Sequence, residues 1–155
     1  MKNFLKISGL IIVFAGLDQL TKYLAVMYLK DPFALIGTFA KLQYVENTGI
    51  AFSLPVPYEL ILASNFVLLF LLMVFVRKVV DLSEFSARIC VSMIIAGGIG
   101  NLIDRLLHHF VIDFISIWAY PFFNLADVFI TIGVLLLVLF YGRIKQVKTK
   151  NYDGN

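Results

Sequence analysis

The sequence predicts a mainly α-helical membrane protein, a four-transmembrane-helix bundle with a small extracytoplasmic β element. Of the 155 residues, 61% are hydrophobic and 15% are charged, whereas a soluble domain keeps roughly a quarter of its residues charged. Four apolar segments approach the ~20 residues that a helix needs to cross the hydrocarbon core. The basic residues gather at the ends of these segments. Together, these observations indicate that lipid is the solvent for most of the chain.

The four predicted spans belong to a single domain of residues 1–155. They cover about residues 4–23, 58–76, 86–105 and 122–141, and the polar tail, 146–155, is expected to be flexible. The first stretch follows two lysines, as a secretory signal does, but no small-residue cleavage site comes after it, so we interpret it as a retained span. This composition excludes a disordered chain, a disulfide scaffold and an ordinary cytosolic enzyme.

The basic residues predict the orientation of the chain. If both termini are cytoplasmic, nine Lys and Arg residues lie inside and four lie outside, in accordance with the positive-inside rule. The net charge of +3 also raises the question of a nucleic-acid ligand. However, the basic residues end apolar runs instead of lining one face between aromatic residues, so we expect no nucleic-acid partner.

Two predicted outer loops contain segments with the pattern of short strands. In residues 24–57, apolar and polar residues alternate in part from Phe39 to Val45. In residues 106–121, the segment 111–115 is a second extended candidate. We therefore expect short strands that lie on the outer membrane surface.

Carboxylates concentrate near one end of the predicted spans. A charge at mid-bilayer costs about 2.5–3.5 kcal/mol on insertion scales, so each one needs a reason. Asp18 and Asp127 each lie five residues inside the outer end of a span, ~7 Å deep. Asp104 lies at the outer end of the third span, and Asp113 lies in the following loop. The sequence therefore predicts one layer of four carboxylates near the outer face.

Helical spacing adds amides, a glycine and a lysine to this layer. Residues three or four apart share one helix face, and polar faces of this kind point into a bundle rather than toward lipid. The sets with such spacing are Gly97, Asn101 and Asp104, then Asn124 and Asp127, and finally Asp18 and Lys22.

Structural roles remain open for several of these residues. Asp18 and Lys22 could form only an ion pair that orients the first span. The glycine-rich run 97–100 could serve close helix packing instead of cradling an oxyanion. Residues 104–105 could simply end a helix, and residues 47–49 could form an ordinary turn.

Motifs for metal, serine and cysteine chemistry are absent from the sequence. There is no His-Glu-x-x-His, Gly-x-Ser-x-Gly or P-loop, the adjacent His108 and His109 point apart, and Cys90 lies within an apolar run. We therefore expect no metal and no cofactor, and carboxylates as acid and base. If Asp113 and Asp127 approach each other, they share one proton near neutral pH, as in an aspartic protease.

Five sequence blocks, taken in order, resemble the bacterial lipoprotein signal peptidase family, also called signal peptidase II. They are residues 18–22, 47–52, 97–105, 111–114 and 123–127. Glu46 and Ile50 depart from the pattern common in the family, which bears only on details of substrate contact in the first outer loop.

The resemblance implies an intramembrane aspartic endopeptidase of the bacterial cytoplasmic (inner) membrane, with its active site near the outer face. Such an enzyme removes signal peptides from diacylglyceryl-modified prolipoproteins by cutting before the lipidated cysteine. Its partners would be lipidated prolipoproteins and membrane lipid, and one bundle of this size is expected to be monomeric. The resemblance assigns catalysis to Asp113 and Asp127. It assigns supporting or substrate-binding roles to Asp18, Lys22, Asn47, Gly49, Asn101, Asp104, Arg105, Asn124 and Ala126.

Two other classes of function also use intramembrane polar residues. A small proton- or ion-coupled transporter would use them as a relay, and a non-catalytic assembly or chaperone subunit would use them to hold its spans together. The ionisable residues form one outer layer instead of a path across the bilayer, and no inverted repeat is present. These two observations favour the peptidase over the transporter.

Overall fold

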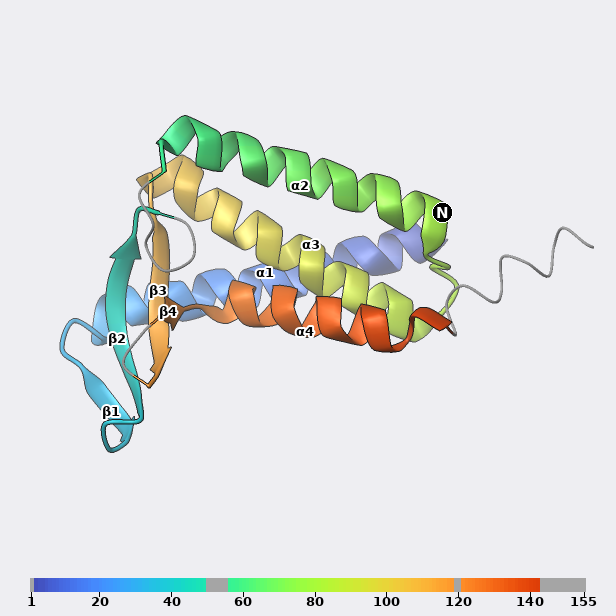
Figure 1. Ribbon diagram of the computed structural model, residues 1–155. Coiled ribbons are helices and arrows are strands. Elements are labelled where there is room, and N and C mark those ends of the chain that lie inside the picture. The colour runs from blue at the N-terminus through green and yellow to red at the C-terminus, as the bar shows by residue number, and fades with distance from the viewer. Residues whose placement is uncertain (1, 50–55, 119–120, 143–155) are drawn as a thin grey trace, which may run out of the picture.

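The computed structural model describes residues 2–49, 56–118 and 121–142. Within these ranges, four helices run alongside one another and a small sheet lies across one end of them (Figure 1). The helices are α1 (Lys2–Tyr28), α2 (Tyr58–Val79), α3 (Phe85–His108) and α4 (Leu125–Leu139). The strands are β1 (Phe33–Ile36), β2 (Ala40–Asn47), β3 (Val111–Ile117) and β4 (Phe122–Phe123). The predicted tail, 146–155, and residues 50–52 of the second sequence block lie outside the described residues.

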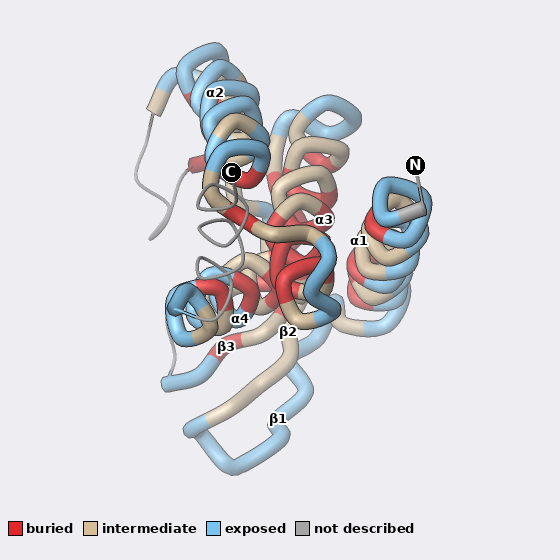
Figure 2. The backbone as a smooth tube through the Cα atoms, turned by 90° about the vertical axis from the view of Figure 1, so that its right-hand side faces the viewer, coloured by how far each residue is buried: buried red, intermediate tan, exposed pale blue. Residues whose placement is uncertain are grey.

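The central element of the bundle is α3. It packs extensively against α4 and α1, and more sparsely against α2. Figure 2 shows that the buried residues concentrate on α3 and on the sides of the other helices that face it. Cys90 is fully buried and belongs to an apolar cluster of α2, α3 and α4, which confirms it as a packing residue. The outer helix faces carry large exposed apolar side chains, as expected of surfaces that face lipid.

Three of the described helices are long and apolar enough to cross a membrane. They are the stretch Asn3–Tyr28 of α1, then α2 and α3. The fourth helix, α4, is also apolar but has 15 residues. Its length of about 22 Å is less than the ~30 Å hydrocarbon core. The three long apolar helices and the four-stranded sheet confirm the prediction of a mainly helical membrane protein with a small β element.

The last helix begins later than the sequence predicts. The expected span started at residue 122, but Phe122 and Phe123 form β4 and pair with β3. The helix α4 starts only at Leu125, after Asn124 has capped it. As a result, Asp127 lies in the first turn of its helix instead of five residues inside a span. At the other end of the chain, α1 continues beyond the predicted boundary at residue 23 to Tyr28.

The four strands form one antiparallel sheet in the order β1-β2-β3-β4, which confirms the expected short strands. A left-handed residue, His109 with φ 66°, ends α3 and turns the chain directly into β3. The backbone N–H of Ile112 then donates to Asp104 Oδ2 at 3.0 Å, which attaches β3 to the end of α3. This reversal places Asp113, next in the strand, beside the polar end of the bundle.

Close helix packing explains two glycines of α3. A Cβ atom at Gly97 would collide with the carbonyl oxygen of Ala126, and a Cβ at Gly100 would collide with the Asp18 carboxylate. The packing interpretation of this glycine run is therefore confirmed for these two positions. The absence of side chains lets α1 and α4 approach α3 at the level of the polar residues.

Candidate active site

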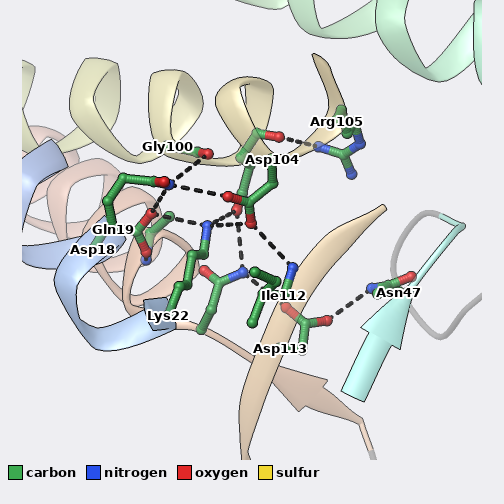
Figure 3. A network of polar contacts seen from close by, with 12 residues as sticks. Asp18, Gln19, Lys22, Asn47, Gly100, Asp104, Arg105, Ile112 and Asp113 are labelled. Atoms are coloured by element: carbon green, nitrogen blue, oxygen red, sulfur yellow. Dashed lines mark hydrogen bonds and ion pairs between the residues drawn. The ribbon is translucent and has the colours of Figure 1, made fainter. Parts of the chain in front are cut away.

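A buried ion cluster joins α1 to α3 at the sheet end of the bundle (Figure 3). Lys22 Nζ lies 2.9 Å from Asp18 Oδ2 and 2.9 Å from Asp104 Oδ2, and all three side chains are at most 1% exposed. The same Nζ donates to Asn101 Oδ1 at 3.1 Å. The predicted pairing of Asp18 with Lys22 is confirmed, but Lys22 also neutralises a second carboxylate on another helix.

Hydrogen bonds compensate the remaining negative charge of this cluster. Asp18 Oδ1 accepts from the backbone N–H of Ala126 at 2.8 Å, within the first turn of α4. That interaction is favourable because the N-terminus of a helix carries partial positive charge. Gln19 Nε2 donates to Asp104 Oδ1 at 3.0 Å and also lies 3.3 Å from the Gly100 carbonyl oxygen. The cluster therefore connects α1, α3, β3 and α4.

Asn124 occupies the junction between this cluster and the two predicted catalytic residues. Its Oδ1 accepts from the backbone N–H of Asp127 at 3.0 Å, and Asp127 Oδ2 accepts from the backbone N–H of Asn124 at 3.2 Å. This reciprocal pair is a capping box at the start of α4. Asn124 Nδ2 also donates to Asp113 Oδ1 at 2.8 Å and to Asn101 Oδ1 at 3.1 Å. One amide side chain thus contacts both Asp113 and Asp127.

Asp113 is held on β3 by two neutral amides. Asn124 contacts its Oδ1, and Asn47 Nδ2 donates to its Oδ2 at 2.9 Å. The side chain is 2% exposed. The pKa of Asp113 is raised to about 6, mainly because the carboxyl is buried and in part because of the charge of Asp127, while the two amide hydrogen bonds and Lys22 lower it. Asp113 therefore retains a proton in mildly acidic solution.

Asp127 is the more accessible of the two carboxyls. Its Oδ1 accepts from Asn101 Nδ2 at 2.8 Å. Together with Phe123, Val128, Thr131 and Ile132, it lines a cavity of about 320 Å³ on the surface of α4. The Asp127 carboxyl therefore borders a hollow whose other lining residues are mostly apolar.

The remaining predicted site residues lie at the edges of this network. The backbone N–H of Gly49 donates to Asn47 Oδ1 at 3.1 Å, so the turn at 47–49 orients the amide that contacts Asp113. Arg105 Nη1 lies 3.5 Å from the carbonyl oxygen of Asn101. The Arg105 carbonyl accepts from Tyr58 Oη at 2.8 Å, which links α2 to the site. Within the described ranges, no group of three His, Cys, Asp or Glu residues has the arrangement of a metal site.

Two contributors to the network were not among the predicted site residues. Gln19 joins the ion cluster, and its amide within a span beside Asp18 was a signal that could have found it. Tyr58 was interpreted only as an aromatic residue at a span end, and nothing in the sequence indicates its contact with Arg105.

Comparisons with known proteins give consistent results. A family model described as signal peptidase (SPase) II matches residues 10–142. A lipoprotein signal peptidase of Chlorobium phaeobacteroides (strain BS1) is 40% identical over 162 residues, covering 92% of this chain and 98% of that protein. A lipoprotein signal peptidase of Caldicellulosiruptor bescii is 44% identical over 124 residues, covering 78% of this chain and 80% of that protein.

Two solved structures described as bacterial membrane enzymes have similar folds. One has a TM-score of 0.77 and 27% identity, and covers 97% of this chain and 93% of its own. The other has a TM-score of 0.74 and 29% identity, and the match covers 86% of this chain and 90% of that chain. The likeness therefore extends over nearly the whole architecture, including the sheet end of the bundle.

Proposed function

The chain belongs to the signal peptidase II family of aspartic peptidases, and from this premise we propose that Asp113 and Asp127 form its catalytic dyad. The observation that carries the proposal is the double contact of Asn124. It donates to Asp113 Oδ1 at 2.8 Å and caps α4 through the backbone of Asp127. One residue in this way contacts both carboxyls, because the Asn124 side chain donates to Asp113 and the Asn124 backbone N–H donates to Asp127 Oδ2 at 3.2 Å, beside the cavity that Asp127 lines.

The proposed substrate is a prolipoprotein whose cysteine carries a diacylglyceryl group, cut at the bond before that cysteine. Its apolar signal segment lies in the same membrane as the enzyme, so both meet by lateral diffusion. The groove beside Asp127 is lined by Phe123, Val128 and Ile132, which suits an apolar substrate better than a charged one.

The two carboxyls would divide the acid and base roles. Asp113, with its raised pKa, holds the proton and donates a hydrogen bond to the scissile carbonyl oxygen. Asp127, the more accessible carboxyl, takes a proton from the attacking water as the oxygen of that water bonds to the carbonyl carbon. The tetrahedral intermediate then collapses, the C–N bond breaks, and the amine leaves with a proton from the dyad. Asn101 donates to Asp127 and Asn124 donates to Asp113, and Lys22 in turn donates to Asn101.

The proposed topology places the polar end of the bundle at the outer face of the bacterial inner membrane. Nine basic residues would then lie on the cytoplasmic side and four on the outer side, with both termini in the cytoplasm. We include α4 as the fourth span. The exposed apolar side chains of the sheet, Phe33, Leu35 and Ile36 among them, would rest on the outer leaflet. We propose a monomer, because the dyad and its supports all come from one chain.

The test is cleavage of a diacylglyceryl-modified precursor by purified protein in detergent, with and without a chelator. Asp113→Asn and Asp127→Asn should each abolish cleavage while the circular dichroism spectrum stays unchanged. Asp31→Asn, at an exposed carboxylate outside the network, is the matched control and should retain activity. Turnover by either dyad variant, or loss of wild-type cleavage on chelation, would contradict the assignment.

A further inference from the structure

A second apolar groove lies between α2, α3 and α4, away from the carboxyls. Its volume is about 260 Å³. The residues that line it are Asn65, Leu68, Leu69, Leu72, Ile94, Gly98 and Ile130. Asn65 is the only polar side chain among these seven.

The amide nitrogen of Asn65 is buried and has no hydrogen-bond partner among the described residues. The neighbouring polar residue of α2 is different, because Ser64 Oγ donates to the Ile61 carbonyl at 2.7 Å. A buried donor without an acceptor is unfavourable, and lipid chains on the outer face of α2 offer none. Asn65 Nδ2 therefore needs a hydrogen-bond acceptor, and a molecule that occupies the groove would supply it.

The groove begins close to the candidate active site. Ile130 lies three residues after Asp127 on α4, and Gly98 lies three residues before Asn101 on α3. Each interval corresponds to about 4.5 Å along a helix axis. The groove therefore opens roughly one helical turn deeper in the bundle than the polar network.

We propose that Asn65 Nδ2 donates a hydrogen bond to an acyl ester carbonyl of the substrate's lipidated cysteine, and that the acyl chain lies in this groove. The inference rests on the proposed function and names the substrate group that the groove takes. Only the thioether and glycerol atoms separate such an ester from the cysteine backbone. The Leu69 side chain lies beside Gly98, and Asn65 lies one helical turn before Leu69, toward the sheet end of α2. An ester bound by Asn65 therefore leaves the scissile bond close to the level of the dyad.

Two observations favour the acyl ester over the signal helix as the occupant. An α-helix has a diameter of about 10–12 Å, whereas a space of about 260 Å³ between three packed helices suits a slender chain. Carbonyl groups within a helix are already bonded along it, while an ester carbonyl in hydrocarbon has no other donor. The ester thus supplies the acceptor that Asn65 lacks.

The experiment compares two substrates that differ only in their two ester carbonyls. One precursor peptide carries a diacylglyceryl cysteine, and the other carries the corresponding dialkyl ether. Both are assayed in a detergent without ester groups, so that the substrate is the sole source of ester. The wild type should cleave the ester with about three- to tenfold higher kcat/KM, the range expected for one hydrogen bond. In Asn65→Leu this preference should disappear, because the ester loses its hydrogen-bond donor and the ether has none to lose.

Ser64→Ala is the matched control, because it removes a polar group of α2 that already has a partner, and it should keep the ester preference. Equal cleavage of ester and ether by the wild type would overturn the proposal. Equal loss on both substrates in Asn65→Leu would also overturn it, since that result indicates a contact with the signal peptide or a packing role. If the wild type cleaves neither substrate, the proposed function itself fails.

Discussion

The side chain of Asn124 accepts a hydrogen bond from the backbone of Asp127 at 3.0 Å while the carboxylate of Asp127 accepts one from the backbone of Asn124 at 3.2 Å. This capping box starts α4 and fixes the direction of the Asp127 carboxylate in the same set of bonds. Helix stability and site geometry therefore depend on one residue, but on different atoms of it. The cap uses Oδ1, whereas the contact with Asp113 uses Nδ2.

Substitutions at Asn124 should separate the two roles. Asn124→Ser keeps an oxygen that can cap α4 but lacks the amide donor to Asp113. We expect unfolding free energy within about 1 kcal/mol of the wild type and a fall in kcat of about three- to tenfold, as for loss of one hydrogen bond to a neutral carboxyl. Asn124→Ala should lose a further ~1 kcal/mol of stability with the cap. Equal activity of Asn124→Ser and the wild type would show that the Nδ2 contact is dispensable.

Removal of the Lys22 ammonium group should lower the stability of the protein. Lys22→Met leaves Asp18 and Asp104 buried without a counter-charge, and breaking a buried ion cluster typically costs about 3–5 kcal/mol. We expect a marked fall in the thermal midpoint in detergent. Lys30→Met, at an exposed lysine just after α1, is the matched control and should change the midpoint little. A midpoint unchanged by Lys22→Met would mean that the two carboxyls bind protons at little cost.

Glycine substitutions test the close approach of α1 to α3. A Cβ at Gly100 would collide with the Asp18 carboxylate, so Gly100→Ala should cost about 1–3 kcal/mol and disturb the ion cluster. Gly9→Ala provides the control on α1, because its added Cβ meets nothing within 4 Å. That control should be neutral or stabilising by up to ~1 kcal/mol, in line with helix propensity. Thermal unfolding of the two variants side by side measures the difference.

Helical arithmetic predicted the gathering of the carboxylates. Residue numbers along the predicted spans placed Asp18, Asp104 and Asp127 in one layer, and the structure confirms that one connected network joins them. Their exact depths were wrong, because α1 ends later and α4 begins later than predicted. Their catalytic and supporting roles stay predictions. The sharing of Lys22 between two helices was not predicted, because spacing along one helix shows only the partner on that helix.

The sequence patterns could not predict the strand register, and hydropathy alone misplaced the start of α4. Asn47 reaches Asp113 because β2 pairs with β3 with a shift between Leu42 and Val45, and no spacing rule gives such an irregularity. The apolar pair Phe122–Phe123 continues the hydrophobic run of α4, so hydropathy assigned it to the span. Only its pairing with β3 reveals that it is a strand. The Asn-x-x-Asp spacing at 124–127 was a capping signal that could have corrected the boundary.

The pKa of Asp113 predicts a pH dependence of stability and of activity. The folded-state value of about 6 exceeds the ordinary value of 3.8, mainly because the carboxyl is buried. Between these values the folded state binds more protons than the unfolded chain, so the unfolding free energy falls as pH rises through about 4 to 6. The loss is on the order of 2–3 kcal/mol and should be absent in Asp113→Asn.

Because Asp113 is the proposed proton donor, kcat/KM should decline on the alkaline side with an apparent pKa near 6. Thermal midpoints of the wild type and of Asp113→Asn measure the effect on stability, and initial rates from pH 4.5 to 7.5 measure the effect on activity. A rise in kcat/KM through pH 6 would instead assign the base role to Asp113 and exchange the two carboxyls in the proposed mechanism.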